Sequence, residues 1–161
     1  MRKKPELTLK TRALQYLARR EYSRAELAAK LRPYVQIEDD FEQLQPVELE
    51  ALLDDLTARG WLSDARAVTQ LLHARRLRFG TQRITHELRQ KGIGEELIAQ
   101  AMPELKETEL ESACGVWQRK FGVLPQDDKE KARQMRFMQS RGFGFDVIFK
   151  VLRHAQADHE E

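Results

Sequence analysis

The stretch Lys91-Gly92-Ile93-Gly94 places a glycine between a basic residue and a large apolar one, and this order decides the fold. It recurs at Arg59-Gly60-Trp61 and at Arg141-Gly142-Phe143-Gly144. A cation in the last helical turn favours the negative end of the helix dipole, and a glycine just beyond it takes the left-handed conformation that caps the helix. We expect the bulky residue to fold back onto the helix end. Three such triplets, each between segments of helical periodicity, indicate one helical unit repeated along the chain.

Two alignments without gaps support the repeat. Residues 89–98 align on residues 139–148, and residues 19–31 align on residues 76–88. Apolar positions coincide in both registers, which is typical of units that share a core face. The alternative interpretation is three unrelated helices with common capping chemistry.

The periodicity predicts an all-α fold without a sheet, because no segment alternates strictly between apolar and polar residues. We predict three tandem three-helix repeats of helix-turn-helix-like appearance, over residues 1–62, 63–105 and 106–161. The last repeat ends in a short frayed C-terminal tail. Since units of about 40–50 residues bury little surface alone, we expect them to pack against one another in an elongated array.

Local signals predict several helix ends. Ser23, with Glu26 three residues later, predicts a capping box at the start of a helix. A further helix is expected over residues 46–59. Pro103 closely follows a short helix, and the next helix is expected to begin near Glu107.

The composition indicates a well-solvated helical protein, with 34% charged and 7% aromatic residues. No hydrophobic stretch is long enough to span a membrane. The basic start Arg2-Lys3-Lys4 is not followed by the apolar run of a secretory signal. A single cysteine, Cys114, cannot form an internal disulfide, which fits a reducing cytoplasm.

The chain shows none of the motifs that organise catalysis. It has no glycine-rich phosphate loop, no zinc-protease motif and no paired cysteines. The four histidines are scattered, and Cys114 has no base nearby in the sequence. We therefore expect a binding protein, without catalytic residues, a cofactor or a metal site.

The charge is strongly patterned, although the net charge is only +2. Residues 1–32 carry ten basic and three acidic side chains, residues 65–92 carry seven and one, and residues 131–153 carry six and one. Acidic segments separate these blocks. Stacked units could align the basic blocks into a stripe that attracts phosphates through counterion release. Alternatively, each block neutralises its neighbours across helix contacts.

Two clusters of basic residues are the candidate binding surface. They could contact a nucleic-acid backbone or an acidic protein groove, or simply solvate helices and pair with neighbouring glutamates. No helix has the Asn, Gln and Arg content expected of a base reader, so sequence-specific recognition is not expected. The candidates are Arg75, Arg76, Arg78, Arg83, Arg89, Lys91, Arg133, Arg136, Arg141, Lys150 and Arg153.

The order and spacing of several short motifs resemble the bacterial RecX family over roughly residues 10–154. In the region Arg75 to Ile98 the motif is Arg78-Phe79-Gly80, then Ile84-x-x-Glu87-Leu88-x-x-Lys91-Gly92-Ile93, then Glu95-Glu96-Leu97-Ile98. Elsewhere it is carried by Gly60-Trp61-Leu62-x-Asp64, Lys120-Phe121-Gly122 and Arg141-Gly142-Phe143-x-Phe145-x-x-Ile148.

The chain departs from the family pattern at two places, and both concern the packing around the first repeat. Ala67 stands where the family usually has an aromatic residue. The acidic segment 33–46, with Phe41 and Leu44 as candidate anchors, replaces a shorter connection.

The resemblance implies three tandem three-helix units and a regulator of the RecA recombinase. Such a protein would lie along the RecA filament on single-stranded DNA and limit its growth or promote its disassembly. ATP hydrolysis, strand exchange and coprotease activity would then fall. We expect a cytoplasmic monomer that touches RecA and the DNA in the filament, with weak direct DNA binding as an addition. The alternative is a stand-alone, non-specific DNA-binding helical module.

Overall fold

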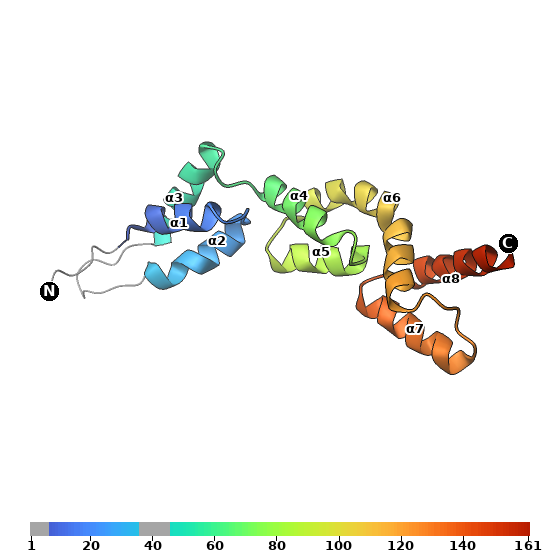
Figure 1. Ribbon diagram of the computed structural model, residues 1–161. Coiled ribbons are helices and arrows are strands. Elements are labelled where there is room, and N and C mark those ends of the chain that lie inside the picture. Colours follow the sequence, from blue (N-terminus) through green and yellow to red (C-terminus); the bar gives the residue numbers. More distant parts are fainter. Residues whose placement is uncertain (1–6, 36–45) are drawn as a thin grey trace. The chain divides into compact units, whose positions relative to one another are not determined.

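The structure, a computed structural model, describes residues 7–35 and 46–161 (Figure 1). Within these ranges every regular element is helical and no strand occurs, so the all-α prediction is confirmed. None of the described helices combines the length and apolar character needed to cross a bilayer. The elements are α1 (Leu9–Leu17), α2 (Arg24–Leu31), the short 3-10 helix η1 (Arg32–Tyr34), α3 (Pro46–Ala58), α4 (Asp64–Arg75), α5 (Thr81–Gln90), α6 (Glu95–Lys120), α7 (Asp128–Ser140) and α8 (Phe145–Glu160).

The chain forms two compact units. Among the described residues, the first comprises 7–35 and 46–67 together with 91–93, and the second comprises 68–90 together with 94–161. The second unit therefore contains α5, α6, α7, α8 and most of α4. The predicted boundaries of the three repeats, and their elongated arrangement, stay predictions.

The first unit buries one face of each of its three α-helices. Leu27 and Leu31 of α2 lie against Leu53 and Leu56 of α3, and all four are fully buried. The predicted capping box is confirmed, because the Ser23 hydroxyl accepts from the Glu26 backbone N–H while the Glu26 carboxylate accepts from the Ser23 backbone N–H. The second helix therefore starts where the sequence predicts it. The candidate anchors Phe41 and Leu44 lie outside the described residues.

The glycines of the three triplets adopt the predicted left-handed conformation, with φ of 74° at Gly60, 73° at Gly92 and 92° at Gly142. The expectation for the following residue holds at Ile93 and Phe143, which are buried, but it is wrong at Trp61, which is 43% exposed.

In the first triplet the residue after the tryptophan is the one that packs inward. Leu62 is buried, and both Trp61 N–H and Leu62 N–H donate to the carbonyl of Leu56. The indole stays outside with Arg59 and Lys10 over its ring, at 5.2 and 5.9 Å from the centroid. These cations stabilise the exposed position of the ring.

The predicted helix end at Pro103 is wrong, because α6 continues through this proline without interruption. A proline inside a helix removes one hydrogen bond to the residue four positions earlier, here Ala99. Both Pro103 and Ala99 are exposed, so water can satisfy the carbonyl that loses its partner. A single helix therefore provides core residues on both sides of the proline, such as Ile98 before it and Trp117 after it.

The C-terminal part of the second unit packs α7 and α8 on the end of α6. Phe143 and Met138 are each 1% exposed within this core. Gln134 of α7 is also buried, and its amide oxygen accepts from the Trp117 indole N–H at 2.8 Å. Its amide nitrogen donates to the Val123 carbonyl at 3.0 Å. This buried amide is thus hydrogen-bonded at both ends and fixes α7 against α6.

Candidate nucleic-acid interface

The start of α5 contacts the turn between α7 and α8, and both elements lie in the second compact unit. Gly80 N–H donates to the Arg141 carbonyl at 2.7 Å, and Gln82 N–H donates to the Gly142 carbonyl at 3.2 Å. A Cβ on Gly80 would lie only 2.6 Å from the Phe143 nitrogen. The glycine therefore lets two backbones approach to a distance that no side chain would allow.

A corresponding contact occurs inside the first compact unit, between the start of α2 and residues 91–93. The Ser23 hydroxyl donates to the Lys91 carbonyl. A Cβ on Gly92 would collide with the Cβ of Ala25. The two sequence registers place Ser23 on Gly80 and Lys91 on Arg141, so this contact is a property of the repeat.

The two equivalent contacts differ in charge. In the first unit the Glu26 carboxylate accepts from Arg20 at 3.0 Å and from Lys91 at 3.2 Å, so both cations there have an ion-pair partner. The register that places Ser23 on Gly80 places Glu26 on Arg83. The second unit thus has a cation where the first has its central carboxylate. Arg141, which aligns with Lys91, is also positively charged.

Around this second contact, cations and aromatic rings form what we call the cation–aromatic row: Lys120, Phe137, Arg141, Phe79 and Arg83. The Arg83 guanidinium lies 4.1 Å from the Phe79 centroid, and the Arg141 guanidinium lies 5.3 Å from the same centroid and 5.2 Å from that of Phe137. Lys120 Nζ is 5.1 Å from the Phe137 centroid. Within the described ranges none of these three cations forms a salt bridge. They carry positive charge that the fold holds in place but does not neutralise.

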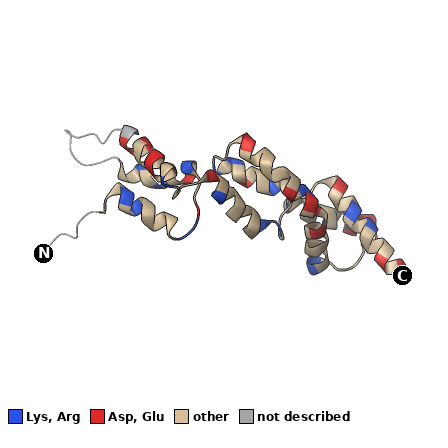
Figure 2. Ribbon diagram, turned by 90° about the horizontal axis from the view of Figure 1, so that it is seen from above, with Lys and Arg blue, Asp and Glu red and all other residues tan. Residues whose placement is uncertain are grey.

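Five of the eleven predicted binding residues do pair with carboxylates, as the alternative interpretation of the basic clusters expects. Most helices in Figure 2 carry both acidic and basic residues, so carboxylates are available as ion-pair partners for the arginines and lysines. Lys91 lies in the first unit and the other four in the second. The pairs are Arg75–Glu87, Arg76–Glu104, Arg89–Glu95, Lys91–Glu26 and Arg133–Glu130, at 2.7 to 3.3 Å.

The remaining predicted residues are Arg83 and Arg141, which belong to the row, and four exposed cations that make no salt bridge to any described residue. These four are Arg78, Arg136, Lys150 and Arg153.

Sequence reasoning missed the aromatic members of the row and Lys120. The alignment of Phe79 on Tyr22 could have found Phe79, but it does not point to Phe137 or Lys120. In the first unit the Arg20 guanidinium lies 3.6 Å from the Tyr22 centroid, so an aromatic ring at this position supports an arginine in both copies.

The Glu26 carboxylate gives the first unit a testable dependence on pH. Burial alone would raise the pKa of Glu26, but hydrogen bonds from Arg20 and from the Ser23 backbone, with the charge of Lys91, outweigh it and lower the pKa. A carboxyl whose pKa is lower in the folded state stabilises the fold above its unfolded pKa. This contribution is lost as the pH falls through the folded pKa.

We therefore expect Glu26→Gln to lower the free energy of unfolding of the first unit at neutral pH. The difference from the unmodified protein should shrink as the pH falls from about 7 to about 3, across the ordinary range of carboxyl pKa values. Urea denaturation at a series of pH values measures this, with Glu48→Gln as the control that removes an exposed carboxylate from α3. A difference that stays constant with pH would show that the charge of Glu26 does not matter.

The cation–aromatic row offers positive charge, and its chemistry suits an anionic ligand. In the part of the chain that the structure describes, no group of three or more His, Cys, Asp or Glu side chains could hold a metal ion. Burial, together with the charge of Asp158, raises the pKa of the Cys114 thiol, which disfavours the reactive thiolate. The row presents arginines, whose planar guanidinium groups suit phosphate oxygens.

Fold and site together define an all-α protein of repeated three-helix units with a preorganised cationic surface. Two family models match the chain: the second three-helix domain of RecX over residues 63–102 and the third three-helix domain of RecX over residues 107–152. The chain is 50% identical over 157 residues to "Regulatory protein RecX" of Leptothrix cholodnii, covering 98% of this chain and 95% of the relative. It is 41% identical over 151 residues to the protein of the same name from Ralstonia nicotianae, covering 94% and 90%.

Solved structures agree on the fold. The structure of RecX from Lactobacillus salivarius superposes with a TM-score of 0.74 at 15% identity, over 92% of this chain and 95% of that one. A second structure, of regulatory protein RecX, gives a TM-score of 0.70 at 20% identity, over 89% and 70%. The chain belongs to the RecX family.

Proposed function

We propose that this protein is a negative regulator of the RecA recombinase. It binds the RecA filament on single-stranded DNA, limits filament growth or promotes disassembly, and so lowers ATP hydrolysis, strand exchange and coprotease activity. Membership of the RecX family supports this proposal, together with the absence of catalytic motifs from the sequence. The observation that carries the DNA part of the proposal is the cation–aromatic row, with three cations that no described carboxylate neutralises. We further propose that it acts as a monomer in the cytoplasm.

The row suits a phosphate backbone better than base edges. Arg83 and Arg141 lie over Phe79, so the ring already supports guanidinium groups. Arg83 also donates to the Ser140 carbonyl at 3.2 Å, which fixes its direction. Cations fixed in this way lose little side-chain entropy when they bind phosphate oxygens. Contacts of this type position a protein on nucleic acid without reading its sequence, as a filament regulator requires.

The decisive measurement is RecA ATP hydrolysis on single-stranded DNA while this protein is titrated in. Because each regulator bound to a filament affects many RecA subunits, we expect inhibition well below one molecule per RecA. Free DNA in excess serves as the control for simple competition. Inhibition that occurs only when the regulator saturates the DNA would contradict filament regulation.

The alternative function is a stand-alone, non-specific DNA-binding module, which the same row favours. It predicts affinity for single-stranded DNA without RecA and a steep decrease of that affinity with salt. Fluorescence anisotropy with a labelled oligonucleotide over a salt series distinguishes the two functions when it is compared with the ATPase titration.

A further inference from the structure

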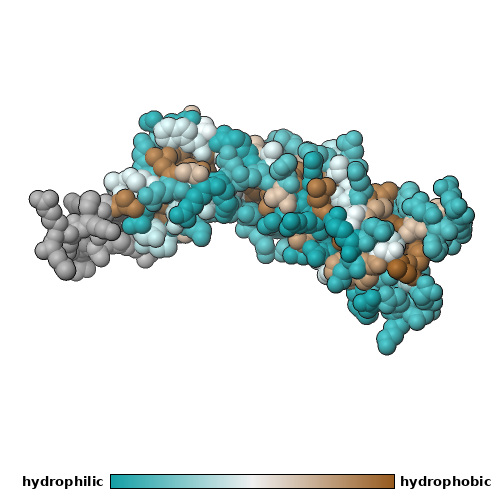
Figure 3. Space-filling model, viewed as in Figure 1, coloured by the Kyte–Doolittle hydropathy of each residue, from teal (hydrophilic) through white to brown (hydrophobic). Residues whose placement is uncertain are grey.

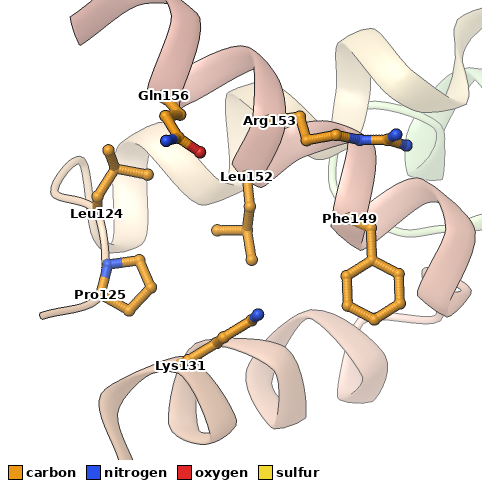
Figure 4. Close-up of a pocket in the computed structure, with 7 residues that line it drawn as sticks. All are labelled: Leu124, Pro125, Lys131, Phe149, Leu152, Arg153 and Gln156. Carbon is orange, nitrogen blue, oxygen red and sulfur yellow. The ribbon is translucent and has the colours of Figure 1, made fainter. Parts of the chain in front are cut away.

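A groove outside the cation–aromatic row lies in the second compact unit, between the loop that follows α6, helix α7 and helix α8 (Figure 4). Its volume is about 640 Å³. The residues that line it are Leu124, Pro125, Lys131, Phe149, Leu152, Arg153 and Gln156.

The groove combines an aliphatic surface with positive charge. Leu124 and Pro125 come from the loop and Leu152 from α8, while Lys131 and Arg153 supply the cations (Figure 4). None of the described residues that line it is acidic. Lys131 and Arg153 are exposed and form no salt bridge with any residue that the structure describes. An occupant that complements this groove must therefore carry both apolar and negatively charged groups.

Apolar side chains remain exposed in the groove and beside it. Phe149 is 42% exposed and Phe145 is 52% exposed, and their rings stack with centroids 6.3 Å apart. Val123, in the same loop as Leu124, is 64% exposed. Figure 3 shows hydrophobic surface over the α7–α8 region, surrounded by hydrophilic residues. Exposed apolar patches with a polar rim are typical of protein interaction sites.

We propose that this groove binds a short acidic segment of a protein partner that also carries large apolar side chains. An apolar side chain of the segment packs among Leu124, Pro125 and Leu152, and its carboxylates accept hydrogen bonds from Lys131 and Arg153. Burial of the apolar side chain supplies affinity, and the two charged contacts fix the direction of the segment.

The chemistry favours such a peptide over a nucleic acid. A nucleobase would stack on an aromatic ring, but Phe149 already stacks with Phe145 and has Lys131 Nζ 6.0 Å from its centroid. The other apolar lining residues are aliphatic, and these side chains suit an aliphatic or aromatic side chain of a peptide better than a polar base. The inference depends only on the groove and not on RecA being the partner.

Nuclear magnetic resonance of the isotopically labelled full chain tests the proposal. The probe is the hexapeptide acetyl-EDLFDE-amide, and the comparison peptides are QNLFNQ, which lacks the charges, and EDAADE, which lacks the large apolar side chains. We expect chemical-shift changes from the probe to concentrate at Leu124, Lys131, Leu152 and Arg153. Each comparison peptide should bind about tenfold more weakly, which corresponds to the loss of one strong contact.

Charge reversal completes the test. The double variant K131E/R153E should lower the affinity for the probe about tenfold or more. The control is K129E, because Lys129 is exposed on the same helix as Lys131 but does not line the groove. K129E should change the affinity less than twofold. Circular dichroism verifies that the variants fold. Equal binding of all three peptides, or no shifts at the groove residues at millimolar probe, would overturn the proposal. The same shifts produced by oligo(dT) would assign the groove to nucleic acid instead. The RecA ATPase titration tests the proposed function, and its result does not depend on the result for the groove.

Discussion

Replacement of Gly142 by alanine is expected to lower the free energy of unfolding of the second compact unit by about 3–5 kcal/mol. Part of this cost is conformational, because a non-glycine residue at a φ of 92° is strained by roughly 1–3 kcal/mol. The rest is steric. The new Cβ would lie 2.6 Å from the Arg83 nitrogen and 3.0 Å from its Cα, and overpacking of this kind costs typically 1–3 kcal/mol.

The clash cannot be relieved by a rotation of the arginine side chain, because backbone atoms are involved. Either the start of α5 moves away from the turn, or the turn itself opens. Both outcomes break the backbone hydrogen bonds from Gly80 and Gln82 to this turn. The substitution therefore acts on the contact that joins α5 to the α7–α8 turn, and through it on the position of Arg83.

Gly122→Ala is the matched control, because Gly122 also has a positive φ, of 65°, in the same unit. Its Cβ would meet the Gln118 carbonyl oxygen at 3.2 Å, a tight contact without a collision. We expect a loss of only about 1–2 kcal/mol there. Urea denaturation followed by the fluorescence of Trp117, in a Trp61→Phe background, reports on the second unit. Equal losses in the two variants would mean that the start of α5 does not press against Gly142.

Much of the fold follows from the sequence because its signals are local. A glycine after a cation caps a helix wherever it occurs, and the capping box of Ser23 and Glu26 needs only four consecutive residues. Pro103 misled the prediction, because whether a proline ends a helix depends on what surrounds the freed carbonyl. Whether that face of the helix is exposed depends on the packing of the whole unit, so the residues next to Pro103 do not predict it.

The candidate site was harder to predict, because the state of a cation depends on partners that are distant in sequence. Arg76 lies beside Arg75 in the chain, yet each has its own glutamate, Glu104 and Glu87. Arg141 is brought to Phe79 only by the folded contact of α5 with the α7–α8 turn. Counting basic residues therefore located the basic segments of the chain but could not separate cations that pair with a carboxylate from those that do not.

This distinction changes which substitutions test DNA binding. Reversing the charge of Arg76 or Lys91 would break an ion pair with a carboxylate, so a loss of function could reflect a loss of structure. Arg83 and Arg141 have no such partner among the described residues. Reversing their charge therefore breaks no ion pair with a described carboxylate.

The double variant R83E/R141E is expected to lower the affinity for single-stranded DNA about 100-fold at low salt. Each hydrogen bond between a charged donor and a phosphate contributes about 1.5 kcal/mol, so two lost contacts amount to about 3 kcal/mol. The slope of log K against log salt should decrease by about 1.4, since each lost phosphate contact removes about 0.7 on a single strand. Anisotropy titrations over a salt series measure both quantities.

The control R89E/R133E changes the net charge by the same amount but removes cations that pair with Glu95 and Glu130. If position matters, its affinity for DNA should fall less than about fivefold, from long-range electrostatics alone. Equal losses in the two double variants would show that net charge, and not the cation–aromatic row, determines DNA binding. If a variant loses DNA affinity but still inhibits RecA ATP hydrolysis below one molecule per RecA, the DNA contact is dispensable for regulation. In that case the main contact with the filament is made to RecA.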